Sequence, residues 1–360
     1  MKDITYIFTG GRNLKLESNE IMASDFFYGF IEFQQKLDNA NFFELGEENT
    51  KLIDKLIIKI TKLPIYFFKA LNTTNYKDII KTKNIIFVNE SSLFSFFPIF
   101  FLLRKNFRGK LHFIPMGLVD TFISGNFITR KIIKFCLSYI DNILFIGKGE
   151  LENYHKHIGI NSNNCQYIPF SIDVDFWKDE EIKIRNIKNL LFIGNDRNRD
   201  YQLINELSES IQKYNITVIT TNEKYISKEQ ENIKHIKGSW RSGLLTDVQI
   251  LEEYKKADLV IIPLSETTQP SGQSVALQSM SSGTPVMITR TKGFWDEINF
   301  INKKNIFFIE NNNPDTWIKF IDSIASDLPL LKSVSEDGKN VINEIHNIKK
   351  FTEKLDIFLA

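Results

Sequence analysis

Two short apolar runs that flank one helical segment restrict this chain to a small set of folds. The runs at 259–263 and 285–289 have the apolar, β-branched composition of buried strands. Between them, a polar loop opens a helical pattern that ends at Gly283. Strands joined through a helix lie parallel, and parallel sheets are covered on both faces. The segment therefore predicts an α/β fold.

The same alternation of short strand patterns and longer helical patterns continues through the chain. We predict strands at 5–9, 84–89, 110–115, 142–146, 190–193, 216–220, 233–237, 259–263, 285–289 and 306–309. Helical patterns fill the gaps, for example at 24–37, 50–60, 91–107, 149–158, 201–213 and 247–256. Repeated alternation of this kind implies parallel sheets with helices on both faces.

The pattern restarts in the middle of the chain. A chain of 360 residues is long for one core and favours about two domains. Pro169 and the polar run 177–188 indicate an interdomain link, after which a new strand series begins. We therefore predict two Rossmann-like domains that face each other across a cleft. The predicted units are a first domain at 1–168, a second at 169–340, and a C-terminal helix at 341–360 that packs back toward the first domain.

The loop that opens the helix after 263 is a candidate anion site. Ser271, Gly272, Gln273 and Ser274 place free backbone N–H groups at a helix N-terminus, where anions bind. Gly272 allows close approach of a ligand. The alternative interpretation is an N-cap on Ser271 or Ser274 without a ligand. In an α/β protein this point lies where strands end and ligands bind, so we predict a phosphate-bearing donor, a nucleotide sugar.

Charge and motifs disfavour several other functional classes. The net charge of +1 does not indicate nucleic-acid binding through bulk charge. No strand is followed by GxGxxG, and no P-loop motif occurs, which disfavours hydride transfer on NAD and P-loop phosphoryl transfer. Cys136 and Cys165 lack metal-ligand spacing, so we expect neither a zinc site nor a disulfide framework. The apolar run 93–103 is too short to span a membrane and is expected to be a core helix.

The second half contains five blocks in a fixed order: a P-N-G-V-D-x-x-x-F-like linker at 168–176, a strand ending in Gly194, a G…L-x-x-x-Y-x-x-A-D-like segment at 238–258, a loop, helix and G-T-P-V strand at 271–286, and a T-x-G at 291–293. Together they resemble the C-terminal domain of the retaining, family 4-like glycosyltransferases of GT-B fold (glycosyl transferases group 1). The resemblance is weaker over 1–165. There it rests on Gly10-Gly11 after the first strand and on 143–147 before Glu150.

The resemblance implies a donor site at the strand ends. It implies that Arg199, which falls nearest the family's lysine, and Arg197 beside it hold the donor phosphates. The implied donor-binding residues are Gly10, Gly11, Gly194, Asn195, Ser271, Gly272, Gln273, Ser274 and Gln278. A solvated loop is the alternative for each arginine, and a tight turn is the alternative for Gly10-Gly11.

This chain departs from the family pattern at the sugar end of that site. The family's two glutamates, eight positions apart, are here Pro270 and Gln278. Gln278 can still hydrogen-bond to ribose hydroxyls, and Glu266 and Gln269 lie near the missing first carboxylate. The histidine that the family often has after the strand near residue 114 is replaced by Met116-Gly117.

The activity that the resemblance implies is that of an EC 2.4 hexosyltransferase. It moves a sugar from a nucleotide-diphosphate donor to a glycan or glycolipid acceptor with retention. The acceptor hydroxyl attacks on the leaving-group side and the departing phosphate takes its proton. Cations and backbone N–H groups stabilise the leaving charge, so we expect no metal and no cofactor besides the donor. Two alternatives stay open: a GT-B sugar-nucleotide epimerase, and a non-catalytic sugar-nucleotide-binding scaffold, which Pro270 and Gln278 keep open.

A basic helix in the first half bears on the acceptor. Lys51, Lys55, Lys59 and Lys62 lie on one helical face, with Leu and Ile opposite. A basic amphipathic helix is typical of proteins at an anionic membrane surface and favours a lipid-linked acceptor. The alternative is an ordinary solvated helix face over the core. Because residues 1–8 lack the apolar region of a signal peptide, we expect a cytoplasmic protein, peripheral on the inner face of the membrane.

Overall fold

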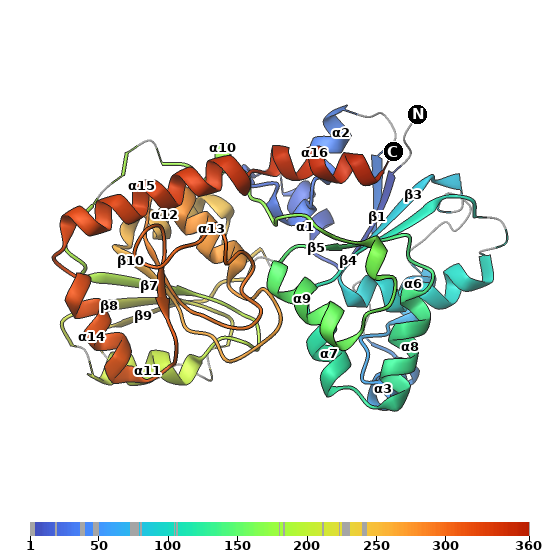
Figure 1. Ribbon diagram of the computed structural model, residues 1–360, viewed down its shortest axis with the longest axis horizontal. Helices are drawn as coiled ribbons and strands as arrows, with labels where there is room; N and C mark the ends of the chain where they lie inside the picture. The colour runs from blue at the N-terminus through green and yellow to red at the C-terminus, as the bar shows by residue number, and fades with distance from the viewer. Residues whose placement is uncertain are drawn as a thin grey trace.

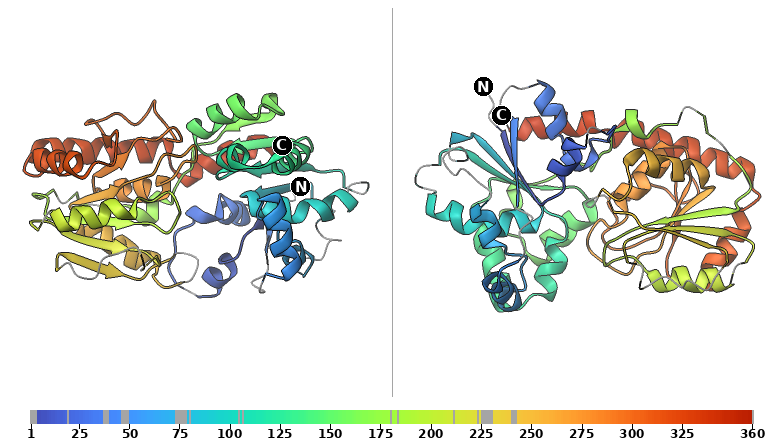
Figure 2. Two further views of the ribbon diagram at one scale, coloured as in Figure 1. Left: turned by 90° about the horizontal axis from the view of Figure 1, so that it is seen from below. Right: turned by 180° about the vertical axis from the view of Figure 1, so that it is seen from behind.

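The computed structural model describes residues 4–18, 20–36, 40–45, 50–72, 79, 81–103, 105, 107–179, 181–182, 184–210, 212–222, 224, 231–239 and 243–359. This part of the chain contains two six-stranded sheets, one in each half. All strand pairs are parallel. Figure 1 shows the sheets as the centres of two lobes, each with helices on both faces, and Figure 2 shows the same two lobes from below and from behind. The predicted α/β class with two Rossmann-like domains is confirmed.

The first sheet has the strand order β2-β1-β3-β4-β5-β6. Its strands are β1 (Ile4–Phe8), β2 (Ala40–Glu44), β3 (Asn84–Val88), β4 (Lys110–Ile114), β5 (Asn142–Phe145) and β6 (Cys165–Tyr167). The order reverses between β1 and β3, as in flavodoxin-like sheets. At such a reversal, ligands bind beyond the carboxyl ends of the two strands. Here these ends lead into Thr9 after β1 and Asn89 after β3.

The second sheet has the strand order β12-β11-β10-β7-β8-β9. Its strands are β7 (Asn189–Ile193), β8 (Asn215–Ile219), β9 (Ile233–Ile236), β10 (Leu259–Ile262), β11 (Val286–Thr289) and β12 (Phe307–Ile309). Counted from its own first strand, this is the 3-2-1-4-5-6 order of dinucleotide-binding domains. Its reversal lies between β7 and β10, whose ends lead into Gly194 and Pro263.

Helices connect the strands in both domains. Those of the first half are α1 (Arg12–Glu17), η1 (Asp25–Phe27), α2 (Phe30–Lys36), α3 (Leu52–Thr61), α4 (Phe67–Asn72), α6 (Glu90–Leu103), α7 (Leu118–Ser124), α8 (Phe127–Leu137), α9 (Lys148–His157) and η3 (Ser162–Asn164). Those of the second half are α10 (Val174–Trp177), α11 (Tyr201–Ser210), α12 (Asp247–Lys256), α13 (Gln273–Ser281), α14 (Pro314–Ile324), α15 (Leu328–Ile345) and α16 (Ile348–Phe358).

The ten predicted strands all occur, but two strands and one helix differ from the prediction. The edge strands β2 and β6 were not predicted. The single helix predicted at 24–37 is wrong, because the chain forms η1 and then α2. Tyr28 and Gly29 separate them with φ of 51° and 83°, values that a right-handed helix cannot contain. Leu37 lies outside the described residues.

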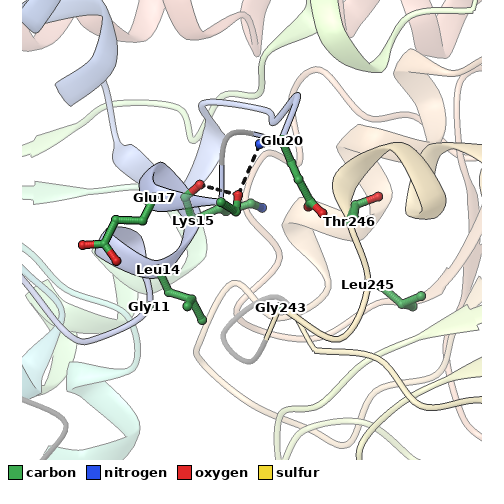
Figure 3. Close-up of a pocket in the computed structure, with 9 residues that line it drawn as sticks. Gly11, Leu14, Lys15, Glu17, Glu20, Gly243, Leu245 and Thr246 are labelled. Carbon is green, nitrogen blue, oxygen red and sulfur yellow. Dashed lines mark hydrogen bonds between the residues drawn. The ribbon is translucent and has the colours of Figure 1, made fainter.

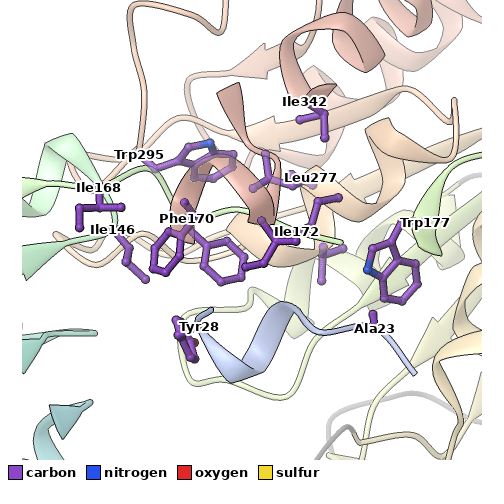
Figure 4. Close-up of a cluster of buried hydrophobic side chains, with 14 of the residues drawn as sticks. Ala23, Tyr28, Ile146, Ile168, Phe170, Ile172, Trp177, Leu277, Trp295 and Ile342 are labelled. Atoms are coloured by element: carbon purple, nitrogen blue, oxygen red, sulfur yellow. The ribbon is translucent and has the colours of Figure 1, made fainter. Parts of the chain in front are cut away.

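The link between the lobes is packed inside an apolar cluster. Ile168, Phe170 and Ile172 are buried and belong to one cluster with Trp295 and Ile342 of the second domain. Figure 4 shows these side chains between segments of both domains. An apolar core that continues across a junction favours a fixed arrangement of two domains over free motion.

The chain crosses between the lobes a second time near its end. In place of one helix at 341–360, α15 ends at Ile345 and α16 begins at Ile348. Ile172 N donates to His346 O (2.8 Å) and Ile348 N donates to Ile172 O (2.9 Å), so the two crossings are hydrogen-bonded to each other. α16 then lies beside α2 of the first domain (Figure 1). The division of the chain at 168 and 340 stays a prediction.

Helix α3 does not pack its apolar side on the core. Leu52 is 82% exposed and Leu56 57%, whereas Asp54 is fully buried. Asp54 and Thr61 face inward, and the lysines and most of the leucines and isoleucines share the outer surface. Ile57 still packs against the core. The predicted placement of the lysines opposite the leucines and isoleucines is therefore not observed, and the choice between a membrane-facing and a solvated helix stays a prediction.

Candidate active site between the two sheets

The ends of the central strands of both sheets line one cavity of about 530 Å³. The first domain contributes Thr9 after β1 and Asn89 after β3, and the second contributes Gly194 after β7 and Ser274 from α13. Both sheets reverse their strand order at these points. The cavity therefore lies where doubly wound sheets bind ligands, at two reversals at once.

Arg199 is the buried cation of the second-domain wall. The residue is 6% exposed, and its Nε donates to Ile193 O at 3.3 Å. A Cβ on Gly194 would lie 2.4 Å from that Nε, so glycine at this position lets the guanidinium lie against the end of β7. Nη1 lies 3.0 Å from Asp196 Oδ2, without the alignment of a hydrogen bond. Nη1 is thus ion-paired with Asp196, and a bound anion would share the guanidinium with this carboxylate.

The first turn of α13 lies beside Arg199. Gly272 precedes the helix with a φ of 78°, in the left-handed region that favours glycine. A Cβ there would lie 2.8 Å from Ile262 Cγ2 and 3.7 Å from Arg199 Nη1. Residues 271–274 also line a second cavity of about 140 Å³ that adjoins the first. The N–H of Ser271, expected to be free, instead donates to Gln269 O at 2.7 Å. Helix N-terminal amides and a guanidinium thus face the same space, which suits a phosphate group.

The structure brings together most of the residues that the sequence singled out. Those that line either of these two cavities are Gly194, Asn195, Arg199, Ser271, Gly272, Gln273, Ser274 and Gln278. Arg197 is exposed and is absent from the described lining of both. Gly10 is likewise absent from these linings, and Gly11 lines a third cavity instead.

Gln278 is held by protein groups at both ends of its amide. Its Oε1 accepts from Tyr254 Oη (3.0 Å) and its Nε2 donates to Asp25 Oδ2 (2.8 Å). Asp25 comes from the first domain, is fully buried, and also accepts from Trp177 Nε1 at 2.7 Å. Burial raises the pKa of Asp25 to about 7 although these donors oppose the shift. In the structure the Gln278 amide thus joins the domains at the cavity wall.

Arg12 is a site residue that the sequence reasoning missed. It is 5% exposed, lines the larger cavity, and stacks over the Phe8 ring at 4.4 Å. Its guanidinium donates to Thr9 O (2.7 Å) and to Phe26 O (3.1 Å). The signal was present, because Arg12 follows directly on the Gly10-Gly11 pair after the first strand. A second cation therefore faces the cavity from the first domain.

Two buried carboxyl groups fix the loop after β4. Glu90 Oε1 accepts from Met116 N (2.8 Å), and Glu150 Oε1 accepts from Gly117 N (2.9 Å) and Leu118 N (3.0 Å). Burial raises the pKa of Glu90 to about 7 and that of Glu150 to about 8. The Met116 side chain lines both cavities where the family often has histidine. The loop is thus held rigidly, with a thioether in place of a titratable ring.

A third cavity of about 300 Å³ opens beside α1 (Figure 3). Leu14 and Lys15 of α1 line one side, and Gly243 and Thr246 line the other. Lys15 Nζ pairs with Asp247 Oδ1 at 2.6 Å, and Asp247 lines the larger cavity. This ion pair between the domains therefore lies where the two cavities adjoin.

In the described residues, no three His, Cys, Asp or Glu side chains are grouped so that they could hold a metal ion. Among the helices in the same part of the chain, none combines the length and apolar character that crossing a membrane requires.

The second-domain wall of the cavity lies in a segment with known relatives. Residues 187–327, from just before β7 to just beyond α14, match the family described as glycosyl transferases group 1. The match is confined to this segment, which is less than half of the chain. The segment contains β7, Arg199 and α13, so the buried cation and the loop before α13 both lie within the part of the chain that matches the family.

Known proteins resemble the chain at low sequence identity. The uncharacterized glycosyltransferase MJ1607 of Methanocaldococcus jannaschii is 24% identical over 201 residues, which are 51% of this chain and 50% of that protein. The match thus spans about half the length of this curated relative.

Solved structures extend the likeness to the whole fold. HepE (Alr3699) of Anabaena, solved with UDP-glucose, has a TM-score of 0.72 at 9% identity and covers 100% of this chain and 99% of its own. Sucrose-phosphate synthase of Thermosynechococcus elongatus has a TM-score of 0.70 at 13% identity, with 99% and 98% covered. The fold is therefore GT-B, as the resemblance implied.

Proposed function

We propose that this chain is a glycosyltransferase that moves a sugar from a nucleoside-diphosphate sugar to a glycan or glycolipid hydroxyl. The observation that carries the proposal is the position of Arg199 beside the first turn of α13, on the wall of a cavity that both domains close. The group 1 match covers this wall. HepE, which shares the fold, was solved with UDP-glucose and with UDP.

The chemistry needs a stabilised leaving group. As the bond from the anomeric carbon to the β-phosphate oxygen breaks, negative charge collects on that phosphate. Arg199 and the backbone N–H groups at 272–274 supply fixed positive charge there without reorganisation. Arg12 adds a second cation from the opposite domain. Arg197, being exposed, has a weaker claim to the catalytic role that the sequence suggested.

We further propose retention of configuration and independence of metal ions. The acceptor oxygen forms its bond to the anomeric carbon on the face that the phosphate leaves. The acceptor proton passes to a β-phosphate oxygen, so the step needs no enzyme nucleophile. Guanidinium and amide groups take the place that a cation would have in neutralising the diphosphate.

A non-catalytic scaffold is the second candidate. It is favoured by Pro270 in the smaller cavity and by the Gln278 amide, which is hydrogen-bonded to Asp25 and Tyr254. A scaffold would bind nucleotide sugar and release no nucleoside diphosphate when an acceptor is added.

Exposed side chains of the first domain support a peripheral position of the protein on an anionic membrane. Exposed apolar side chains lie on three helices of the first domain, and we call this set the outer apolar face. Its members are Leu52, Ile53, Leu56 and Ile60 of α3, Phe127, Ile128 and Phe135 of α8, and Phe101 and Leu102 of α6.

The three helices of the outer apolar face are in contact. Asn126 Nδ2 donates to Ile60 O at 2.9 Å, and the Phe101 and Phe135 rings lie 5.6 Å apart. α3 and α8 lie at the far end of the first domain from α16 (Figure 1). Large exposed apolar patches are unusual on monomers and mark interaction sites. Lys55, Lys59 and Lys131 beside it match the charge of anionic lipid headgroups.

Donor turnover tests the proposed function. The protein is incubated with UDP-, GDP-, ADP- and dTDP-sugars, with and without lipid extracts or glycan acceptors, and nucleoside diphosphate release is measured. A glycosyltransferase releases nucleoside diphosphate faster when acceptor is present, and proton NMR of the product gives the anomeric configuration. Binding without release would instead support the scaffold, and inversion would contradict the retaining mechanism.

A further inference from the structure

Gln278 lies one helical turn beyond the proposed phosphate position. Ser274 and Gln278 are four residues apart on α13, so they share a face of the helix, with a rise of about 6 Å between them. Both line the larger cavity together with Arg199. Because only the α-phosphate separates the β-phosphate of a nucleotide sugar from its ribose, a β-phosphate beside Arg199 brings the ribose within reach of Gln278. The base then extends toward Gly194 and Gly238, which line the same cavity.

The Gln278 amide keeps half of its hydrogen-bonding capacity for a ligand. A primary amide has two N–H groups and an oxygen with two lone pairs. One N–H donates to Asp25 Oδ2 (2.8 Å), and one lone pair accepts from Tyr254 Oη (3.0 Å). One N–H and one lone pair remain, on a residue that is 5% exposed and lines the cavity. The two neighbouring hydroxyls of a ribose, each of which donates and accepts, match this pair of groups.

Asp25 determines which end of this amide points to the first domain. An ionised carboxylate only accepts hydrogen bonds, so Gln278 must turn its nitrogen, and not its oxygen, toward Asp25. Asp25 is fully buried and also accepts from Asp173 N (2.6 Å) and Trp177 Nε1 (2.7 Å). The Trp177 ring in turn lies 5.9 Å from the Tyr254 ring, edge to face. The groups at both ends of the Gln278 amide therefore belong to one packed cluster.

The backbone around Asp25 is fastened to the second half of the chain. Ala23 N donates to Asp247 Oδ2 (2.9 Å), and Ser24 N donates to Asp173 Oδ2 (3.4 Å). Ala23 is 3% exposed and Ser24 is 6% exposed, so these bonds are shielded from water. Asp25 thus approaches α13 from a fixed position, as a group that orients another must.

We propose that Asp25 is a positioning residue of the donor site, an inference that rests on the proposed function. By holding Gln278 Nε2, this carboxyl group of the first domain presents the remaining N–H and C=O of the amide to the 2′ and 3′ hydroxyls of the donor ribose. The same contact accounts for glutamine where the family pattern has glutamate. A glutamate at this position would place two carboxylates against each other in a buried contact, and one of them would have to take up a proton or move away.

Matched pairs of nucleoside diphosphates test this inference by calorimetric titration of the full chain. The pairs are UDP with dUDP, GDP with dGDP, ADP with dADP, and 5-methyl-UDP with dTDP, and each pair differs only in the 2′ hydroxyl. For the nucleotide that binds, we expect the ribose form to bind about 5- to 100-fold more tightly, because loss of the hydroxyl leaves a buried amide group unpaired. Equal affinities, or a preference for the deoxy form, overturn this inference alone. No binding of any pair refutes the proposed function as well.

A double-mutant cycle separates positioning from mere structural support. Gln278→Met removes the amide and should bring the ribose preference to within twofold of one. Asp25→Asn leaves one oxygen for three N–H donors and should lower the preference at least threefold. In the Gln278→Met background the same change should leave the preference unaltered, because Asp25 acts only through Gln278. A preference that survives in either single variant, or an effect of Asp25→Asn that persists without the amide, overturns the inference.

Two further variants complete the test. Asp120→Asn is the matched control, because Asp120 Oδ1 also joins the domains, by accepting from Thr268 N (3.1 Å) and Oγ1 (2.6 Å), but is absent from the described lining of both cavities. Its ribose preference should stay within twofold of that of the natural chain. Gln278→Glu reports on Asp25 without changing it and serves if Asp25→Asn fails to fold. It should lower the preference at least threefold, whereas a preference equal to that of the natural chain would show that Asp25 does not constrain position 278 and would overturn the inference.

Discussion

Arg199 Nη1 lies 3.7 Å from the point at which a side chain on Gly272 would begin. The guanidinium is therefore adjacent to the backbone of the first turn of α13, with no side chain between them. Ile193 O holds the guanidinium from behind, and the left-handed φ of Gly272 turns the helix N-terminus toward it. A cation and helix N-terminal amides that face one cavity provide the preorganised positive charge that a departing diphosphate requires.

Removal of the Arg199 guanidinium should abolish most of the activity. We expect Arg199→Ala to lower kcat about 10²- to 10³-fold, the usual loss for one preorganised charge-stabilising donor. Steady-state kinetics with the donor identified by the release assay measures this loss. Arg197→Ala removes the same charge two residues away from an exposed position and should cost less than threefold. Equal losses in the two variants would contradict the assignment of Arg199.

A side chain at Gly272 should harm both stability and donor binding. In Gly272→Ala the φ of 78° costs about 1–2 kcal/mol, and the Cβ would contact Ile262 Cγ2 at 2.8 Å. Gly159→Ala is the matched control, because its φ is 64° and it lies at the end of α9, away from the cavities. Urea unfolding should show a loss in both variants. Nucleoside diphosphate titration should show weaker binding in Gly272→Ala alone, and equal affinities would argue against α13 as the phosphate site.

Stability should fall as the pH rises from about 4 to about 7. The folded pKa of Asp25 is raised to about 7, so the folded protein holds a proton there that the unfolded chain releases near its ordinary value. The folded state thus binds more protons in this window, and its stability is greatest at the acid end. Glu90 and Glu150, with pKa values raised to about 7 and about 8, act in the same direction.

Asp25→Asn isolates the contribution of this one carboxyl. One group contributes at most about 1.4 kcal/mol per pH unit to the slope of unfolding free energy. Urea unfolding at pH 5, 6 and 7 should show a shallower fall in the variant than in the natural chain, with a remaining slope from the two glutamates. An unchanged slope would mean that Asp25 titrates as an ordinary carboxyl.

Chelation of divalent cations should leave turnover intact. Because Arg199, Arg12 and the α13 amides supply the positive charge, we expect activity in excess EDTA to stay within twofold of the untreated rate. Addition of Mg²⁺ or Mn²⁺ to the chelated enzyme is the control. A tenfold loss that either ion restores would contradict metal independence.

Anionic vesicles should bind the outer apolar face. Leu52→Ser with Leu56→Ser removes two of its most exposed side chains and should weaken binding to phosphatidylglycerol vesicles at least about tenfold in a co-sedimentation assay. Ile357→Ser is the matched control, because Ile357 is 72% exposed on α16, remote from α3 (Figure 1). No sedimentation of the natural chain with anionic vesicles would refute the membrane proposal outright.

The sequence predicts the alternating strands and helices of this fold well, because patterns of neighbouring residues mark each of them. The central strands are buried runs such as 259–262, and α12 was predicted with its observed bounds. In the structure a capping box at Thr246 begins this helix. The edge strand β6 has three residues, too few for any periodic pattern. The break at Tyr28 depends on a non-glycine residue in the left-handed region, which sequence patterns rarely mark.

The site was predictable only where it follows from strand order. Residues after β7 and before α13 were found because they stand at strand ends. The pairing of Gln278 with Asp25 joins residues 253 positions apart, and nothing local in either segment indicates it. Similarly, α3 reads as amphipathic in sequence, and only the packing shows that its leucines are exposed while Asp54 is buried.

The most direct test of the account is a crystal structure with a bound nucleoside diphosphate, chosen from UDP, GDP, ADP and dTDP by the largest rise in melting temperature. We expect the β-phosphate to contact the Arg199 guanidinium and the backbone N–H groups at 272–274, with the nucleoside toward Gly194 and Gly238. Phosphate density bound elsewhere, with the space beside Arg199 and Gly272 unoccupied by the nucleotide, would contradict it.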